Sequence, residues 1–330
     1  MSAERIAVIG SNSFTGVHFI KHCLDQGAAV LGINRSPEGN PIFLPHKDKA
    51  SEHYRFAQLD LNQDMDQILS EITDFHPDYV VNFAAQGMVG QSWQSPLDWF
   101  NTNTLAMVDL HDRLRQLKFL KRFLHSSTPE VYGSCSGLVP ETAPFQPSTP
   151  YAVSKTACDM SLLTFHKVYD FPVVFTRSAN VFGPAQLLFR IIPRSIIYFL
   201  TGRKLGLHGG GHSVRSFIHI SDVARGTLDI LRNGRNGEVY HLATDRTISI
   251  RGLVELIAQK LDVRFEDCVD IVGDRLGKDS AYLLDTTKVR TELGWAPQCS
   301  LEEGIDECID WVKSNLDIIQ TLPLDYIHKK

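Results

Sequence analysis

Short apolar segments alternate with helical patterns through the first half of the chain. The apolar runs predict buried strands at 6–9, 28–33, 56–59, 79–83, 122–125 and 173–176. Helical stretches fall between them, at 17–26, 64–73, 102–117 and 151–169. Strands that are apolar at every position are typical of a parallel sheet covered by helices on both faces. We therefore predict an α/β fold with a Rossmann-like, doubly wound parallel sheet, whose ligands bind at the carboxyl ends of the strands.

Glycine and proline interrupt the second half, where the helices are shorter and alternate less regularly. We place a boundary near Gly183 and Pro184. The segments around 217–218 and 239–242, joined by a helix at 222–231, are expected to return to the first unit. The prediction is a first domain at 1–182 with a return at 218–246, and a smaller C-terminal α/β domain made of 183–217 and 247–330.

Charge and composition argue against several classes of function. The 330 residues include 33 Lys and Arg against 38 Asp and Glu, a formal net charge of −5, which gives no electrostatic basis for a nucleic-acid or anionic-membrane partner. No run approaches the roughly 18 apolar residues that span a bilayer, and the first residues lack the regions of a signal peptide. Six cysteines without a CxxC pair favour reduced thiols. The 13 histidines show no recognisable metal spacing, so we expect a cytoplasmic enzyme without a metal.

The first predicted strand runs into a turn that has glycine at both ends and opens a helix. Such a turn directs backbone N–H groups and the positive end of the helix dipole at a pyrophosphate, although an ordinary strand–helix turn has the same pattern. The residues expected to bind a dinucleotide here are Gly10, Asn12, Ser13, Phe14, Thr15 and Gly16.

The end of the second predicted strand bears on the choice of dinucleotide. An NAD enzyme usually carries a carboxylate there for the ribose hydroxyls. This chain has Asn34 instead, followed by Arg35 and Ser36, which are suited to a 2′-phosphate. The alternative for Arg35 is a solvated loop cation. On this logic NADP+ is slightly preferred over NAD+.

Tyr151 and Lys155 stand four residues apart on a predicted helix, so the phenol and the ammonium share one face. A nearby cation favours the phenolate, which can remove a proton from a hydroxyl group. The spacing alone is common. Here it follows a strand ending in Ser126-Ser127-Thr128 and a proline-rich loop at 140–150, and we expect the pair to be catalytic.

At these positions the chain resembles the extended short-chain dehydrogenases/reductases, in the branch of nucleotide-sugar (NDP-sugar) 4,6-dehydratases that includes the dTDP-glucose and GDP-mannose enzymes. The resemblance covers nearly the whole chain and rests on the segments 10–16, 82–86, 102–103, 127–133, 151–155, 180–186, 192–193, 214–219 and 274–285. The run Thr-x-Glu-Val-Tyr-Gly at 128–133 is more specific than the Tyr-Lys pair, because related epimerases usually carry a small residue where Glu130 stands.

The resemblance implies a lyase that converts a nucleotide-activated hexose to its 4-keto-6-deoxy form. Tyr151 would take the proton of the sugar 4-hydroxyl, with Lys155 holding it as phenolate and Thr128 bonding the same oxygen. Glu130 would remove the hydrogen on C5, made acidic by the new ketone, before the C6 hydroxyl leaves as water and hydride returns to C6. The cofactor is recycled and should stay tightly bound.

Further contacts are implied in the same way. The additional cofactor contacts are Asp60, Leu61, Ala84 and Ala85. The expected substrate contacts are Gln86, Glu130, Asn180, Gln186, Arg190, Arg215 and Arg275. Arg215 and Arg275 resemble the arginines that hold the diphosphate, and bidentate guanidinium donors suit that role better than the alternative of surface ion pairs. The alternative for Asn180 is the cap of a turn.

Two positions depart from the family pattern. Ser13 stands at the middle glycine of the turn, so a side chain must fit where backbone normally approaches the pyrophosphate. Pro129 stands where many dTDP-glucose dehydratases have the aspartate that protonates the leaving hydroxyl. In this respect the chain is similar to GDP-mannose dehydratases, where the glutamate is thought to handle both proton transfers, so Glu130 would return the proton it gains.

Three functions remain open from sequence: the dehydratase, an NDP-sugar 4-epimerase that uses the same Tyr151 and Lys155, and a non-catalytic nucleotide-binding regulator. Glu130 argues against the second, and the intact catalytic set against the third. The sugar nucleotide is also open among dTDP-glucose, UDP-glucose, UDP-N-acetylglucosamine and GDP-mannose. The family commonly pairs through two long helices, here 102–117 and 151–169, so a homodimer or a dimer of dimers is expected.

Overall fold

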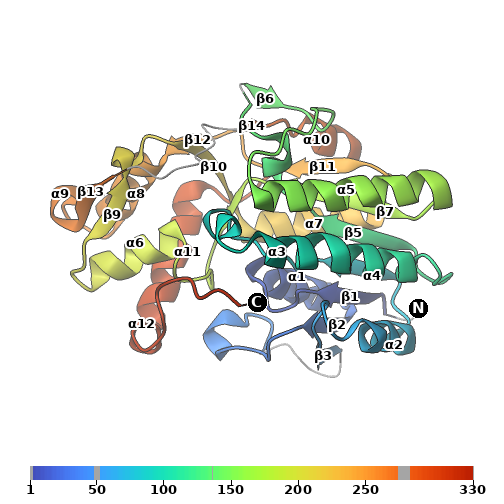
Figure 1. Cartoon of the computed structure of the whole chain (residues 1–330). Helices are drawn as coiled ribbons and strands as arrows, with labels where there is room; N and C mark the ends of the chain where they lie inside the picture. Colours follow the sequence, from blue (N-terminus) through green and yellow to red (C-terminus); the bar gives the residue numbers. More distant parts are fainter. Residues whose placement is uncertain (1–2, 48–52, 136, 274–282, 330) are drawn as a thin grey trace.

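Seven parallel strands form the central sheet, in the order β11-β7-β5-β4-β1-β2-β3 (Figure 1). The structure is a computed structural model that describes residues 3–47, 53–135, 137–273 and 283–329. The strands are β1 (Arg5–Ile9), β2 (Ala29–Asn34), β3 (Tyr54–Gln58), β4 (Tyr79–Asn82), β5 (Arg122–Ser126), β7 (Val173–Ser178) and β11 (Val239–Leu242). The predicted Rossmann-like fold is confirmed, and chain order reverses beside β1, where such sheets bind their ligands.

Helices cover both faces of this sheet because its strands are apolar on both sides. Alternate residues of β1 illustrate this: Ile6 and Val8 belong to one hydrophobic core cluster, and Ala7 and Ile9 to the other. The first cluster includes residues of α1 (Phe14–Asp25) and α7 (Ile220–Asn233), and the second includes residues of α2 (Met65–Phe75), α4 (Ala106–Leu114) and α5 (Pro150–Tyr169).

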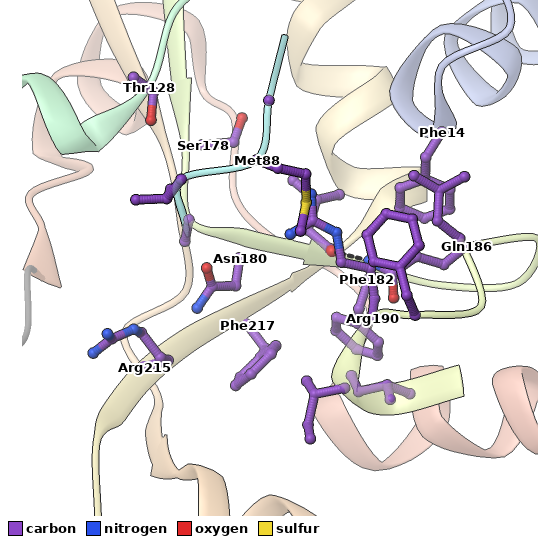
Figure 2. A pocket seen from close by; sticks show the side chains of 18 of the residues that line it. Phe14, Met88, Thr128, Ser178, Asn180, Phe182, Gln186, Arg190, Arg215 and Phe217 are labelled. Atoms are coloured by element: carbon purple, nitrogen blue, oxygen red, sulfur yellow. Dashed lines mark hydrogen bonds between the residues drawn. The ribbon is translucent and has the colours of Figure 1, made fainter. Parts of the chain in front are cut away.

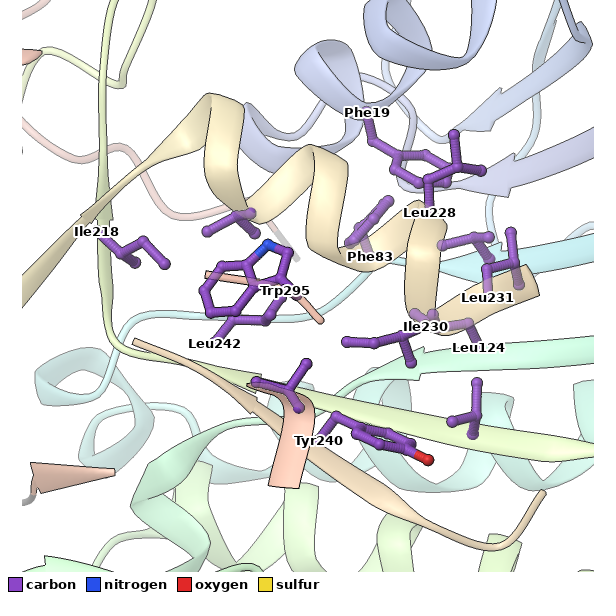
Figure 3. Close-up of a cluster of buried hydrophobic side chains, with 14 of the residues drawn as sticks. Phe19, Phe83, Leu124, Ile218, Leu228, Ile230, Leu231, Tyr240, Leu242 and Trp295 are labelled. Atoms are coloured by element: carbon purple, nitrogen blue, oxygen red, sulfur yellow. The ribbon is translucent and has the colours of Figure 1, made fainter. Parts of the chain in front are cut away.

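One glycine permits the tightest packing in the first cluster. A Cβ on Gly226 of α7 would lie 2.6 Å from the indole nitrogen of Trp295. The indole therefore lies directly against the helix, beside Leu242 (Figure 3), and its N–H donates to the backbone oxygen of Asp222. This contact joins the segment after α10 (Thr287–Leu293) to α7, which covers one face of the sheet.

The helix predicted at 102–117 differs from the structure. It begins earlier, as α3 (Pro96–Phe100), then passes through one π-helical stretch at Asn101–Leu105 before continuing as α4. Its backbone follows α5 closely: Thr104 donates through its hydroxyl to the backbone oxygen of Ser154. None of the helices in the described ranges is long and apolar enough to cross a bilayer.

The second half builds a smaller unit around its own core. That core contains residues from the helices α6 (Ile191–Leu200), α8 (Ile250–Lys260) and α11 (Leu301–Ser314). Two short helices, α9 (Phe265–Cys268) and α12 (Leu316–Ile319), extend it. Its strands pair outside the central sheet. In one sheet, β10 (Val214–His219) lies between β8 (Asn180–Phe182) and β12 (Thr247–Ser249), and in another β9 (Leu205–His208) pairs with β13 (Val269–Val272). A further pair joins β6 (Leu138–Val139) to β14 (Leu283–Leu284).

The two segments predicted to return to the first unit behave differently. The strand at Val239–Leu242 joins the central sheet beside β7. The residues around 217–218 lie in β10, which pairs with β8 and β12 instead. The helix between them, α7, packs against α1 on the central sheet. The division of the chain into 1–182 with 218–246, and 183–217 with 247–330, remains our proposal.

Candidate active site

A cavity of about 1380 Å³ opens between the carboxyl ends of the central strands and the smaller unit. It brings together residues that lie far apart in sequence, contributed by the first turn, α5, β8, β10 and the loop before α6. Figure 2 shows Phe14, Asn180, Gln186 and Arg215 among them. The residues predicted for the site that line it are Ser13, Phe14, Thr15, Ala85, Thr128, Glu130, Tyr151, Lys155, Asn180, Gln186, Arg190 and Arg215.

Other predicted residues lie outside this cavity. Asp60 and Leu61 line a second hollow of about 760 Å³ beside α2 and α4. The rest lie in or next to the turns that support the main cavity, namely Gly10, Asn12, Gly16, Asn34, Arg35, Ser36, Ala84 and Gln86. Arg275 falls outside the described residues.

The first turn has the form needed to hold a pyrophosphate. Gly10 has φ of +80°, and a Cβ there would lie 2.4 Å from the backbone nitrogen of Ala84, so only glycine lets β1 and β4 end this close together. Ser13 is the N-cap of α1: its hydroxyl accepts from Gly16 N and donates to the carbonyl of Gly10. The side chain at the family's middle-glycine position therefore folds into its own turn, and the helix N-terminus still faces the cavity.

The loop after β2 is tied to this turn by side-chain amides. Asn12 Nδ2 donates to the carbonyls of Ser36 and Pro37, each at 3.0 Å, and Asn34 Nδ2 donates to the carbonyl of Ser36 at 3.1 Å. Asn34 thus holds the loop conformation that presents Arg35 and Ser36. In a Rossmann sheet this edge lies beside the ribose of the adenosine.

Thr128, Glu130 and Tyr151 occupy one wall of the cavity. Thr128 caps the short 3-10 turn Pro129–Tyr132, and its hydroxyl accepts from Glu130 N. Burial, and then the nearby Glu130 carboxylate, raise the pKa of Tyr151, and its hydrogen bond with Thr128 opposes the shift. Phenol and carboxylate are therefore close enough to influence each other's charge.

Arg190 provides positive charge at the same place. The side chain of Arg190 is exposed to the cavity, whose walls surround it with protein. These walls exclude bulk water and thereby lower the pKa of Arg190, whereas Tyr151 and Glu130 oppose the shift. Arg215 lines the cavity near Asn180, away from Arg190 (Figure 2), so the two arginines address different parts of a ligand.

Lys155 is 2% exposed and is held beneath Tyr151 by the end of β5. Its ammonium donates to the Nε2 of His125 at 3.0 Å and to the carbonyl of Ser126 at 2.9 Å. Burial lowers the pKa of Lys155. Burial, and then Lys155 itself, hold the pKa of His125 well below its usual value, so the imidazole stays a neutral acceptor.

The expectation that Lys155 holds Tyr151 as phenolate stays a prediction. Burial raises the pKa of the phenol, and the hydrogen bonds of the ammonium described above go to β5. Burial disfavours a phenolate, whereas a nearby cation favours it.

A buried ion pair supports the same wall from behind. Arg177 of β7 donates to Asp159 of α5 at 2.7 Å, and these two residues are 1% and 0% exposed. The same carboxylate oxygen accepts from the hydroxyl of Ser127 at 2.5 Å. Arg177 also donates to the hydroxyl of Tyr132 at 2.5 Å, so one network links both ends of the run 127–132.

Sequence reasoning missed this supporting layer. His125 directly precedes Ser126-Ser127-Thr128, and Asp159 stands four residues after Lys155 on the same helix. The helical spacing could have indicated Asp159, because residues four apart share a face. Nothing in the sequence pairs His125 or Arg177 with α5, since those contacts cross from strand to helix.

The turn and the Tyr-Lys helix, joined at the carboxyl ends of one parallel sheet, define the class of protein. They are the features of an extended short-chain dehydrogenase/reductase. Within this class, the sequence model described as GDP-mannose 4,6 dehydratase matches residues 8–308. The chain belongs to that family of nucleotide-sugar 4,6-dehydratases.

Known relatives agree with this assignment over almost the whole chain. A dTDP-glucose 4,6-dehydratase from Streptomyces antibioticus is 37% identical, with 94% of this chain and 92% of the relative covered. The dTDP-glucose 4,6-dehydratase of Streptomyces venezuelae, solved with NAD bound, superposes with a TM-score of 0.89 at 32% identity, covering 95% and 98% of the two chains. A UDP-glucose 4-epimerase from Thermotoga maritima has a TM-score of 0.86 at 26% identity, covering 94% and 99%, so the fold is shared across both reactions.

The buried ion pair yields a test of what supports the wall. Replacing Asp159 by Ala should lower the free energy of unfolding by about 3–5 kcal/mol, because Arg177 is left as an uncompensated buried charge. The double variant Asp159→Leu/Arg177→Met should cost much less. Urea unfolding of the three proteins measures this.

The matched control is the exposed pair of Asp66 and Arg113, in which Asp66 is 90% exposed. Asp66→Ala should change stability little, because water screens such pairs. Equal losses for Asp66→Ala and Asp159→Ala would show that burial of the Arg177 pair is not what matters.

Proposed function

We propose that this chain is an NDP-hexose 4,6-dehydratase whose chemistry is carried by Thr128, Glu130 and Tyr151. The observation that supports this most is that a carboxylate, a phenol and a hydroxyl share one wall of the cavity at the carboxyl ends of the sheet. An epimerase needs a base and a redox cofactor but no group that removes the hydrogen on C5. Glu130 provides that additional group.

The cofactor of this reaction is a nicotinamide dinucleotide, which when bound takes hydride from C4 of the sugar and returns it to C6. The residues suited to hold it are those of the first turn, where Gly10 lets the ends of β1 and β4 lie close together and α1 presents its N-terminus to the cavity. Within this class we propose a slight preference for NADP+ over NAD+, because Arg35 and Ser36 follow Asn34 where NAD enzymes carry an acid. The Streptomyces venezuelae relative holds NAD, so both dinucleotides are to be compared, by equilibrium binding to this chain.

Tyr151 is the base for the sugar 4-hydroxyl in this scheme. Its phenol starts protonated, because burial and Glu130 raise its pKa. A positive charge near the phenol lowers that pKa; Arg190 acts in this direction, and Lys155, one turn along the same helix, is the cation that we propose to assist it. Thr128, whose side chain hydrogen-bonds with the phenol of Tyr151, also bonds the same substrate oxygen.

Glu130 handles both proton transfers of the water loss, and solvent supplies the proton that C5 regains in the product while Tyr151 releases to solvent the proton of the 4-hydroxyl. Once C4 is a ketone, the hydrogen on C5 is acidic and a carboxylate removes it as a proton. The electron pair left on C5 forms the C5–C6 double bond as the C6 hydroxyl departs. That hydroxyl takes the proton from Glu130 and leaves as water, since Pro129 beside it has no proton to donate.

Arg215, Asn180, Gln186 and Arg190 line the rest of the cavity, and we propose that they bind the nucleoside diphosphate and the sugar, with Gln86 and Arg275 as further candidates. Two arginines at separate positions suit a diphosphate with a sugar at its end. The base and sugar are unassigned. Because relatives that are 34% and 37% identical to this chain are dTDP-glucose 4,6-dehydratases, dTDP-glucose is the first substrate to test.

The assembly we propose is a homodimer or a dimer of dimers paired through α4 and α5. Exposed apolar side chains lie on α5, at Val153, Met160 and Val168, and on the helical segment before α4, at Leu97 and Leu105. Such a stripe is typical of a helix–helix interface. The six cysteines are free thiols, which supports our expectation of the reducing cytoplasm as compartment.

One experiment separates the candidate functions. The purified chain is incubated with dTDP-glucose, UDP-glucose, UDP-N-acetylglucosamine and GDP-mannose, and the products are followed by mass spectrometry and NMR. A dehydratase removes one water and gives a 4-keto-6-deoxy sugar. An epimerase gives an isomer of unchanged mass, and tight cofactor binding without turnover would favour the non-catalytic regulator.

Glu130→Gln should stop water loss while still allowing the first oxidation. The amide keeps the size of the side chain but cannot take the C5 proton. Mixed with substrate, the variant should accumulate absorbance of reduced nicotinamide without 4-keto-6-deoxy product. Normal product formation by this variant would remove Glu130 from its role.

The same substitution should move the pH dependence of the first oxidation. A carboxylate beside Tyr151 raises the pKa of the phenol, so its removal lowers that pKa and leaves more phenolate at a given pH. The pH midpoint for formation of reduced cofactor should therefore be lower in Glu130→Gln than in the wild type, as measured by stopped-flow absorbance. A midpoint shifted upward would contradict the proximity of the two groups.

Tyr151→Phe should block the first oxidation itself. Phenylalanine preserves the packing of α5 but offers no oxygen to accept the 4-hydroxyl proton, and loss of such a base typically costs about 10²- to 10⁴-fold in rate. Neither reduced cofactor nor product should appear in single-turnover assays. An unchanged rate would be fatal to the assignment.

A further inference from the structure

The last described segment of the chain connects the two halves across the cavity mouth. Leu322 and Leu324 pack against the core of the smaller unit. Beyond them, Asp325 accepts from the guanidinium of Arg194 of α6 at 2.8 Å. The ring of Tyr326 then packs edge-on against Phe189, which lines the cavity, with 5.4 Å between centroids.

The next residues contact the Rossmann half. The imidazole of His328 stacks on the buried indole of Trp99, with centroids 5.2 Å apart and an interplanar angle of 12°. Its Nε2 lies 2.8 Å from a carboxylate oxygen of Asp98. Figure 1 shows this end of the chain leaving α12 and running to the middle of the molecule, where the C label lies.

Lys329 joins two strand ends that flank the first turn. Its backbone oxygen accepts from the guanidinium of Arg35 at 3.1 Å and from the side-chain amide of Gln86 at 2.7 Å. Its own ammonium lies 3.4 Å from the hydroxyl of Ser36. Arg35 and Ser36 follow β2, and Gln86 follows β4, while β1 lies between these strands in the sheet.

The position of these contacts is informative because of how a Rossmann sheet binds a dinucleotide. The pyrophosphate lies over the turn after β1, and the ribose of the adenosine lies beside the end of β2. A segment bonded to both the β2 and β4 ends therefore passes over that half of the site. It also brings an additional ammonium to an anionic ligand.

We propose that residues 325–329 are part of the cofactor site: they close over the adenosine half of the bound dinucleotide and slow its release. The proposal rests on the proposed function, in which the same dinucleotide takes up hydride and gives it back in each turnover and has no need to leave. Retention has a physical basis, because the segment is anchored on both sides of the cleft, so its opening requires the His328 and Lys329 contacts to break together. Lys329 adds charge where a 2′-phosphate would lie.

Release of the cofactor tests this directly. A chain ending after Leu324 keeps the two leucines in their core and loses every contact of 325–329. Loaded with NADP+ or NAD+ and diluted into excess unlabelled dinucleotide, it should exchange its cofactor about tenfold faster than the full chain or more, as expected when several charge-assisted hydrogen bonds are lost. His328→Ala should show a smaller increase, since the contacts removed are those of one imidazole with Asp98, Trp99 and Tyr326, while the contacts of Lys329 remain.

The matched control is Ile327→Ala, in the same segment but 62% exposed, and it should exchange cofactor at the wild-type rate. Lys329→Gln keeps the backbone contacts and removes the charge, so it should speed release of NADP+ more than release of NAD+. Thermal unfolding without added cofactor verifies that the shortened chain is folded. Equal exchange rates for the full and shortened chains would overturn the proposal, and slower exchange from the shortened chain would show that the segment obstructs the site instead.

The exchange readout is independent of the reaction. If no variant removes water from any sugar nucleotide but the shortened chain still releases cofactor faster, the proposed function fails and the closure stands. If the shortened chain dehydrates substrate at saturating cofactor and exchanges it at the wild-type rate, the function stands and the closure fails.

Discussion

The hydrogen bonds of one buried ammonium fix the position of the helix that carries the proposed catalytic tyrosine. Lys155 lies beneath the cavity wall, bonded to His125 and to the carbonyl of Ser126 at the end of β5. A buried cation needs such acceptors, because unpaired burial of charge is costly. The bonds therefore hold α5 at one position along β5. That position brings Tyr151, one turn before Lys155, next to Thr128 and Glu130, which follow β5 directly.

The charges around this wall form a buried group and a group on the cavity side. The Asp159–Arg177 pair is buried and is hydrogen-bonded to Ser127 and Tyr132. On the cavity side, the Glu130 carboxylate raises the pKa of Tyr151, while Arg190 lies close to both. The carboxylate therefore disfavours the phenolate and the guanidinium favours it. Groups with shifted pKa values are typical of sites that transfer protons.

Two close approaches connect this chemistry to the rest of the fold. Gly10 lets β1 and β4 converge where a pyrophosphate binds, and Ser13 preserves that surface by turning its hydroxyl into its own loop. The C-terminal segment links the smaller unit to the same edge of the sheet through Asp325 on one side and Lys329 on the other. Residues of both halves of the chain therefore line the main cavity.

The sequence by itself determined the parallel sheet, the first turn and most of the cavity wall, because these depend on local patterns. Apolar strands, a glycine turn and a Tyr-Lys spacing are legible within a few residues, and in parallel sheets the residues after each strand meet at one edge. Tertiary structure decided the rest. The partnership of Lys155 with His125, the π-helical stretch before α4, the placement of 217–218 in a separate sheet and the return of Lys329 to Arg35 all join residues distant in sequence or depend on packing between elements. Such contacts form only when the whole chain packs and particular surfaces come together. A local sequence pattern therefore does not predict them.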